Sequence, residues 1–221
     1  MSVTIRLEAV RNTLPAGVQL VAVSKTHPVE AIAEAYAAGQ RRFGESRPQE
    51  LRAKYEALPR DISWHMIGHL QTNKVRLIAP FVALIESVDS ARLAETIQQE
   101  VLRCGRTIDI LLELHVAREA TKTGWEPADL EAYVASGAFD RLPNLRVRGV
   151  MGIATNTDDE SIVRADFEAL RRAFKRLQPR FGAAFDTLSM GMSDDYLLAV
   201  ACGSTSVRVG SRIFGARDYT K

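Results

Sequence analysis

The sequence predicts a single (β/α)8 (TIM) barrel with an extra N-terminal helix, forming one domain over residues 1–221. Two observations support this fold class: short apolar runs alternate with helical patterns eight times, and no linker or change in composition separates the units. Strand–helix units that alternate strictly form a parallel sheet with helices outside, and eight units suggest a closed barrel. An open doubly wound sheet is the alternative, although the GxGxxG turn that usually follows its first strand is missing.

The strands are predicted from apolar runs such as QLVAVS in the first strand and IDILLELHV in the fifth. Short runs that are apolar throughout are typical of strands buried on both faces. The eight strands are expected at residues 19–24, 42–45, 62–67, 83–87, 108–116, 146–153, 187–190 and 206–209.

The helices are predicted from apolar residues at helical spacing and from the signals at their ends. Pro28 suits a first helical turn and Gly39 a helix end, while Ser90 and Gly105 bracket a further helix. One long amphipathic helix shows alternating steps of four and three between its apolar residues. The helices are expected at residues 2–13, 28–38, 48–58, 73–78, 91–104, 127–136, 163–177 and 194–201, and from residue 211 onward.

The composition is that of a globular protein with a sizeable core. Hydrophobic residues make up 46% of the chain and charged residues 25%, and the formal net charge is +2. A basic cluster at residues 171–176 has acidic neighbours and is interpreted as a solvated helix face, so no nucleic-acid partner is expected. The sequence has no signal-peptide pattern and no apolar stretch of membrane-spanning length. We therefore expect a cytoplasmic protein that does not bind membranes, with Cys104 and Cys202 as reduced thiols.

Functional groups of such a barrel gather at its C-terminal face, where the strands end. Lys25 directly follows the first strand, within LVAVSK. An ammonium at the mouth of an apolar barrel loses water, which disfavours its charge and leaves a nucleophilic amine. This position predicts a Schiff-base lysine, and the alternative is a rim lysine whose charged end reaches water.

The last strand carries Arg208 between two valines, and a charge within a buried strand needs a partner. The partner is either an internal salt bridge or a ligand acceptor, such as an unprotonated ring nitrogen, because a guanidinium only donates hydrogen bonds. Gly210 and Ser211 begin the last helix, where N–H groups and the helix dipole favour an anion, and Ser189 can add a hydroxyl. A plain turn at Gly210 and helix caps at the two serines are the alternatives.

The remaining polar residues carry less information. His65 and His69 are four residues apart, but no acidic general base lies between them, so we interpret them as loop groups and predict no metal site. Nothing in the sequence singles out Glu45 or Glu50 as an acid or a base.

Five segments form a specific pattern that covers the chain nearly end to end. They are AVSKTHPVEAIAEAYAAGQRRFGES (22–46), WHMIGHLQTNK (64–74), RGVMGIA (148–154), LSMGMSDDY (188–196) and GSTSVRVGSRIFGARDY (203–219). This pattern resembles the pyridoxal phosphate homeostasis protein family, which looks like the N-terminal barrel of alanine racemase. The resemblance implies pyridoxal 5′-phosphate (PLP) bound as a Schiff base on Lys25, with its phosphate held by Ser189, Gly210 and Ser211, its ring nitrogen facing Arg208, and Met151 lining the ring pocket.

The chain departs from the pattern of this family at three positions. Family members often have a lysine where His27 stands, an asparagine where Ser46 stands and another asparagine where His115 stands. The second lysine and the amides are therefore missing, which affects the loop contacts that such groups make but not the covalent link to Lys25.

Three functions are compatible with these residues. The first is a non-catalytic carrier or buffer in PLP homeostasis, the second a PLP-dependent amino-acid racemase, and the third an aldolase that uses Lys25 without a cofactor. Racemisation needs two bases, and we expect no second domain to supply one because eight units account for the whole chain. An aldolase leaves Arg208 and the phosphate-like site unexplained. We therefore expect a monomer whose partners are PLP and apo-forms of PLP-dependent enzymes.

Overall fold

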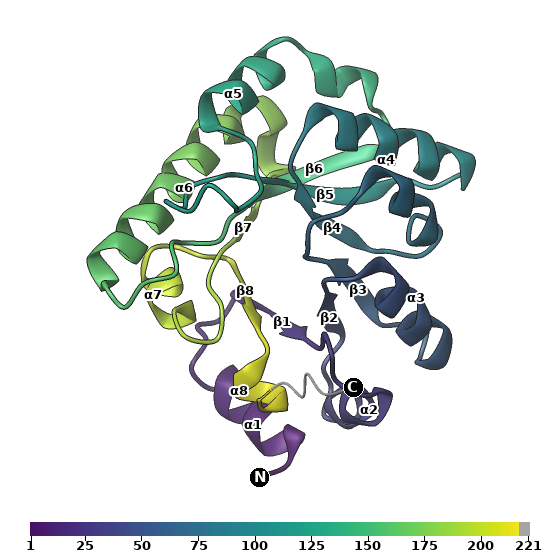
Figure 1. Ribbon diagram of the computed structural model, residues 1–221, viewed down its shortest axis with the longest axis vertical. Coiled ribbons are helices and arrows are strands. Elements are labelled where there is room, and N and C mark those ends of the chain that lie inside the picture. Colours follow the sequence, from purple (N-terminus) through teal and green to yellow (C-terminus); the bar gives the residue numbers. More distant parts are fainter. Residues whose placement is uncertain (217–221) are drawn as a thin grey trace.

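A closed barrel of eight parallel strands forms the centre of the computed structural model, which describes residues 1–216 (Figure 1). Each strand pairs with the next, and β8 pairs with β1 to close the ring. The strands are β1 (Gln19–Val23), β2 (Arg42–Glu45), β3 (Ser63–Met66), β4 (Leu84–Val88), β5 (Ile108–Glu113), β6 (Leu145–Met151), β7 (Thr187–Ser189) and β8 (Ser206–Val209). The fold class predicted from the sequence is confirmed.

The helices lie outside the ring of strands (Figure 1). The α-helices are α1 (Val3–Arg11), α2 (Val29–Ala37), α3 (Pro48–Ala57), α4 (Ala91–Arg103), α5 (Pro127–Ala135), α6 (Glu160–Phe181), α7 (Tyr196–Ala201) and α8 (Ser211–Phe214). Three short 3-10 helices are η1 (Thr72–Leu77), η2 (Ala138–Arg141) and η3 (Gly182–Ala184). No helix within residues 1–216 is long and apolar enough to cross a membrane.

Several observed elements differ from the expected ones in their bounds, as α6 (Glu160–Phe181) does by exceeding residues 163–177 at both ends, and two further differences concern helix type and the path of the chain. The helix expected at residues 73–78 is the 3-10 helix η1, which Pro80 follows closely, so the chain cannot continue as an α-helix. The fifth strand was expected to reach residue 116 but ends at Glu113. Leu114 N still donates to Met151 O of β6 (2.9 Å), and beyond it the chain pairs with Trp125 instead, since His115 N donates to Trp125 O (3.0 Å) and Trp125 N donates to Glu113 O (2.7 Å).

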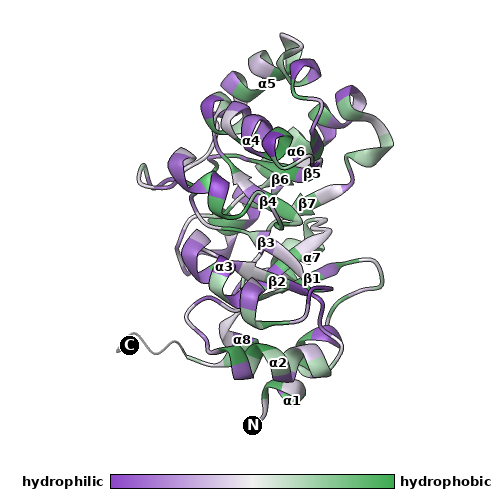
Figure 2. Ribbon diagram, turned by 90° about the vertical axis from the view of Figure 1, so that its right-hand side faces the viewer, coloured by the Kyte–Doolittle hydropathy of each residue, from purple (hydrophilic) through white to green (hydrophobic). Residues whose placement is uncertain are grey.

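The helices cover the barrel through apolar faces, and in Figure 2 the strands β4, β6 and β7 are largely hydrophobic, whereas α3 and α4 carry more hydrophilic residues. In α6, for example, Phe167 and Leu170 are fully buried, as the stepped apolar pattern predicts. Outside the barrel units, α1 packs beside α8 and α2 (Figure 1). Its Arg6 Nε donates to Ile213 O (2.6 Å), which ties the start of the chain to the last helix.

A glycine is required where β6 and β7 approach each other. Gly149 has a φ of +158°, and a Cβ atom on it would lie 1.7 Å from the carbonyl oxygen of Thr187. Gly39 also has a positive φ, +84°, but a Cβ atom there would meet nothing within 4 Å. Alanine substitutions at these two positions therefore distinguish the cost of steric overlap from the cost of a left-handed backbone.

We expect Gly149→Ala to lower the free energy of unfolding by about 3 kcal/mol or more, because overpacking forces the two strands apart. Gly39→Ala should cost only about 1–2 kcal/mol, the penalty of a left-handed residue. Urea unfolding of both variants measures the difference. Equal losses of stability would contradict the close strand contact.

Candidate functional site

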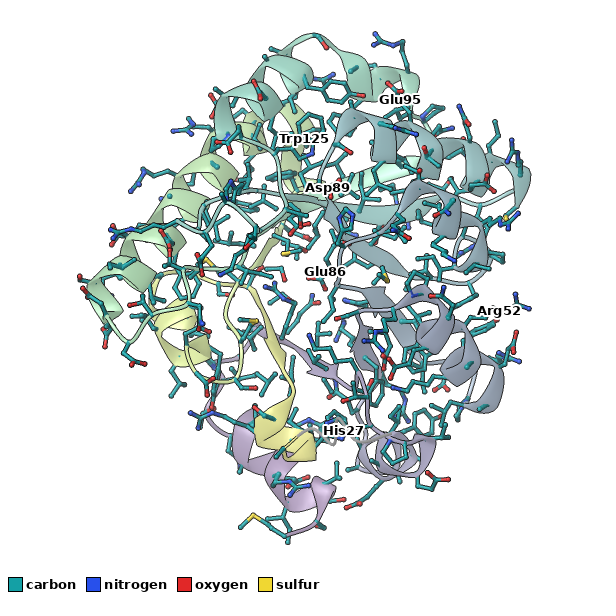
Figure 3. The ribbon with its side chains drawn as sticks, in the orientation of Figure 1. His27, Arg52, Glu86, Asp89, Glu95 and Trp125 are labelled. Atoms are coloured by element: carbon teal, nitrogen blue, oxygen red, sulfur yellow. The ribbon has the colours of Figure 1, made fainter. Side chains whose placement is uncertain are left out.

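The C-terminal face of the barrel brings the predicted site residues together. Lys25 directly follows β1, Met151 and Ser189 end β6 and β7, and Arg208 lies in β8. Because all eight strands are parallel, these residues belong to the same end of the barrel. Figure 3 labels Glu86, from β4, near the centre of the ring of strands, with Asp89 close to it.

Lys25 is half-buried and lies in a tight turn. The next residue, Thr26, has a left-handed φ of +68°, an uncommon conformation for a residue other than glycine. The N–H of Thr26 donates to Glu50 Oε1 (2.6 Å), which compensates part of the cost of this conformation. The turn is therefore fixed by a side chain of α3.

A buried lysine of α3, Lys54, holds the same turn. Its Nζ donates to Ser24 O (2.7 Å) and pairs with Glu45 Oε1 (2.8 Å) and Glu50 Oε1 (2.7 Å). Burial raises the pKa of Glu45 to about 7, although Lys54 and Ser24 act to lower it. One ammonium and two carboxyl groups thus position the backbone that carries Lys25.

Arg208 is 3% exposed and makes three contacts inside the barrel. Its Nη1 donates to Ser189 Oγ (2.5 Å) and its Nη2 to Gly152 O (3.0 Å), and Nη1 lies 3.8 Å from Glu86 Oε2. The internal ion pair that the sequence left open is thus present. Two hydrogen bonds use two of the five N–H groups of a guanidinium, so donors remain for a ligand.

Glu86 continues this chain of contacts across the barrel. Its Oε2 accepts a hydrogen bond from Ser189 Oγ (2.6 Å), and its Oε1 lies 2.7 Å from His65 Nδ1. Burial by itself raises the pKa of Glu86, but the hydrogen bonds and charges of His65, Arg208 and Ser189 outweigh burial and lower that pKa below its ordinary value. Glu86 is therefore the ionised counter-charge to Arg208.

The serine that contacts Gly210 is Ser193, which sequence reasoning did not select. Ser193 Oγ accepts a hydrogen bond from Gly210 N (3.1 Å) and is nearly buried. Ser211 is exposed in the single turn of α8, and a Cβ atom on Gly210 would lie 3.0 Å from Val23 O of β1. Ser189, expected at the phosphate, donates its hydroxyl hydrogen to Glu86 and accepts a hydrogen bond from Arg208.

The other predicted positions are also located. Met151 is fully buried and lies in register with Ser189. His27 stacks on Phe214 of α8, with ring centroids 5.1 Å apart. His115 lies 3.0 Å from both Glu126 Oε1 and Glu119 O, in the loop after β5. The segment GSTSVRVGSRIFGARDY continues past residue 216, and its last residues lie outside the described range.

We expect Glu86→Gln to lower the free energy of unfolding by about 3 kcal/mol at neutral pH, because it keeps the shape but leaves the charge of Arg208 less compensated. The native pKa of Glu86 lies below 4.5, so its contribution is complete above that pH and is lost as pH falls through the lowered native value. Urea unfolding from neutral to acid pH should show that the difference in free energy of unfolding between the wild type and Glu86→Gln becomes smaller.

The control is Glu131→Gln, which removes an exposed ion pair with Arg176 (2.7 Å). An exposed pair contributes about 1 kcal/mol or less. Similar losses in the two variants, or a gap that does not change with pH, would contradict the assignment of Glu86.

Comparison with known proteins identifies the family of the chain. Residues 2–218 match the family described as alanine racemase, N-terminal domain. A pyridoxal phosphate homeostasis protein from Pseudomonas aeruginosa is 42% identical over 206 residues, covering 93% of this chain and 87% of the relative. The counterpart from Vibrio alginolyticus is 40% identical over 211 residues, covering 93% and 89%.

Solved structures show the same relationship. PipY of Synechococcus elongatus, in its structure with PLP bound, has a TM-score of 0.88 and 41% identity, covering 97% of this chain and all (100%) of that one. Alanine racemase from Streptomyces lavendulae shares the fold at a TM-score of 0.80 and 19% identity, covering 97% of this chain but 59% of the racemase. The chain therefore belongs to the pyridoxal phosphate homeostasis protein family and has the fold of the alanine racemase N-terminal domain.

Proposed function

We propose that this protein binds PLP as a Schiff base on Lys25 and serves as a carrier or buffer of the cofactor rather than as a catalyst. The observation that carries the proposal is the buried guanidinium of Arg208, held by Ser189 and Glu86 at the same end of the barrel as Lys25. The PLP-bound structure of PipY and the names of the relatives support it.

The residues at the mouth fit the chemical groups of PLP. Lys25 offers an amine to the aldehyde, Arg208 offers N–H donors to the ring nitrogen, and Met151 offers an apolar surface to the ring. For the phosphate we propose the site at Gly210, whose N–H is bonded to Ser193 Oγ, with the hydroxyls of Ser193 and Ser211 as hydrogen-bond donors. Ser189, in this proposal, supports Arg208 rather than the phosphate.

Arg208 is consistent with a carrier and supports that role, although racemases also function with an arginine that faces the ring nitrogen. When bound, PLP supplies a ring that can withdraw electrons from a substrate, most strongly when its nitrogen is protonated. A guanidinium cannot accept a hydrogen bond, so Arg208 would keep this nitrogen unprotonated and weaken the withdrawal. We propose further that the protein acts as a cytoplasmic monomer whose partners are apo-forms of PLP-dependent enzymes.

We expect PLP-loaded protein to activate the apo-form of a PLP-dependent enzyme, and to interconvert L- and D-alanine at a negligible rate. Activity of the acceptor enzyme and chiral chromatography measure the two outcomes. Ser193→Asp should reduce PLP affinity by well over tenfold, because its charge opposes the phosphate, whereas Ser161→Asp, at an exposed position in α6, should not.

Turnover of alanine at roughly 1–10³ s⁻¹, the range of ordinary enzymes, would make the protein a racemase and overturn the proposal. Failure of the loaded protein to activate the acceptor would contradict the carrier role. Equal PLP affinity of the two serine variants would remove Ser193 from the phosphate site.

A further inference from the structure

A small cavity lies beside the end of β5, at the mouth of the barrel. Its volume is about 210 Å3, and its lining includes Glu113, His69, Thr123 and Ile153. Glu113 is the last residue of β5, is 5% exposed and lies in register with Met151 at the end of β6. The cavity therefore adjoins the residues proposed to surround the cofactor.

One oxygen of the Glu113 carboxyl group has no hydrogen-bond donor. Oε1 accepts a hydrogen bond from Thr123 Oγ1 (3.1 Å), whereas Oε2 is buried without a donor among residues 1–216. Buried polar atoms in proteins nearly always have a partner. An orphaned carboxyl oxygen on a residue that lines a cavity indicates that its donor comes from a ligand.

Two cations near the cavity, Lys122 and Arg208, are engaged with other groups. Lys122, which also lines the cavity, donates its Nζ to Ala154 O (2.6 Å) and pairs with Glu119 Oε1 (3.1 Å). Arg208 is bonded to Ser189 and Gly152. Burial raises the pKa of Glu113, and the neighbouring charge of Asp89 raises it further, against lowering by Thr123, Arg208 and His69. A cation at Oε2 would therefore relieve an unfavourable charge.

We propose that this cavity is an amine subsite, in which Glu113 Oε2 accepts a hydrogen bond from the ammonium group of a primary amine that displaces Lys25 from the cofactor. The inference rests on the proposed function. An ammonium brings three donors and a positive charge, whereas a carboxylate would face the like charges of Glu113 and Asp89. The volume equals about seven water molecules at roughly 30 Å3 each, which suits a small amine or the end of a lysine side chain.

The exchange needs no reactant besides the amine. The entering ammonium gives one proton to Glu113, and its nitrogen forms a bond to the aldehyde carbon of the cofactor. The bond from that carbon to Lys25 Nζ breaks, and Lys25 leaves as an amine that takes up the proton from Glu113. Glu113 thus begins and ends the exchange in the same protonation state.

The test measures release of PLP from the loaded protein in propylamine and, as a matched acid, in propionate. Release should accelerate with propylamine and not with propionate. Glu113→Gln keeps the shape but removes the charge, so the response to propylamine should fall at least tenfold. Glu131→Gln removes a surface carboxyl group between α5 and α6 and should leave the response unchanged.

A second measurement does not depend on the cofactor. Propylamine titrated into the cofactor-free protein should shift the amide NMR signals of Glu113 and Thr123, and Glu113→Gln should abolish these shifts.

Release from Glu113→Gln in propylamine at the wild-type rate, or equal acceleration of wild-type release by propionate and by propylamine, would overturn the amine subsite. A protein that takes up no PLP would instead refute the proposed function, and the titration of the cofactor-free protein would still decide whether the cavity binds an amine.

Discussion

The polar contacts in the barrel interior are organised around the ion pair between Arg208 and Glu86. A permanently charged guanidinium at 3% exposure must be compensated by the protein, and Ser189, Gly152 O and Glu86 provide this compensation. Glu86 in turn depends on His65. These side chains come from β8, β7, β4 and β3, so only a closed ring can bring them together, and the polar contacts therefore link closure of the barrel to the formation of the site.

Two further arrangements place the reactive groups around this centre. The buried cluster of Lys54, Glu45 and Glu50 holds the turn that carries Lys25, on one side of the β1–β8 junction. On the other side, Gly210 comes so close to β1 that a Cβ atom would lie 3.0 Å from Val23 O. The amine and the proposed phosphate site are therefore linked through neighbouring strands, and the distance between them depends little on flexible loops.

The sequence predicts the strand–helix order, the closed barrel and the location of Lys25 and Arg208 at one end of it. These features can be predicted because the spacing of apolar residues and the ends of strands are visible in short stretches of sequence. The partners of Arg208 cannot be predicted in this way. Glu86, in LIESV, shows the same pattern of a charge within an apolar strand that drew attention to Arg208, but only the fold shows that the two meet. Ser193 and Ser189 share the segment LSMGMS, and the local sequence does not reveal which hydroxyl faces Gly210. Likewise, the sequence does not show that Thr123, ten residues further along the chain, bonds one oxygen of Glu113 and leaves the other without a donor.

In the proposed function, Lys25 carries the cofactor in a site built around Arg208. The most direct measurement is reduction of the PLP-loaded protein with borohydride, followed by proteolysis and mass spectrometry of the labelled peptide. We expect the phosphopyridoxyl group on the peptide that contains Lys25, and we expect Lys25→Ala to prevent labelling. Labelling of another lysine in the wild-type protein, such as Lys122 or Lys54, or undiminished labelling of Lys25→Ala, would contradict the assignment of Lys25.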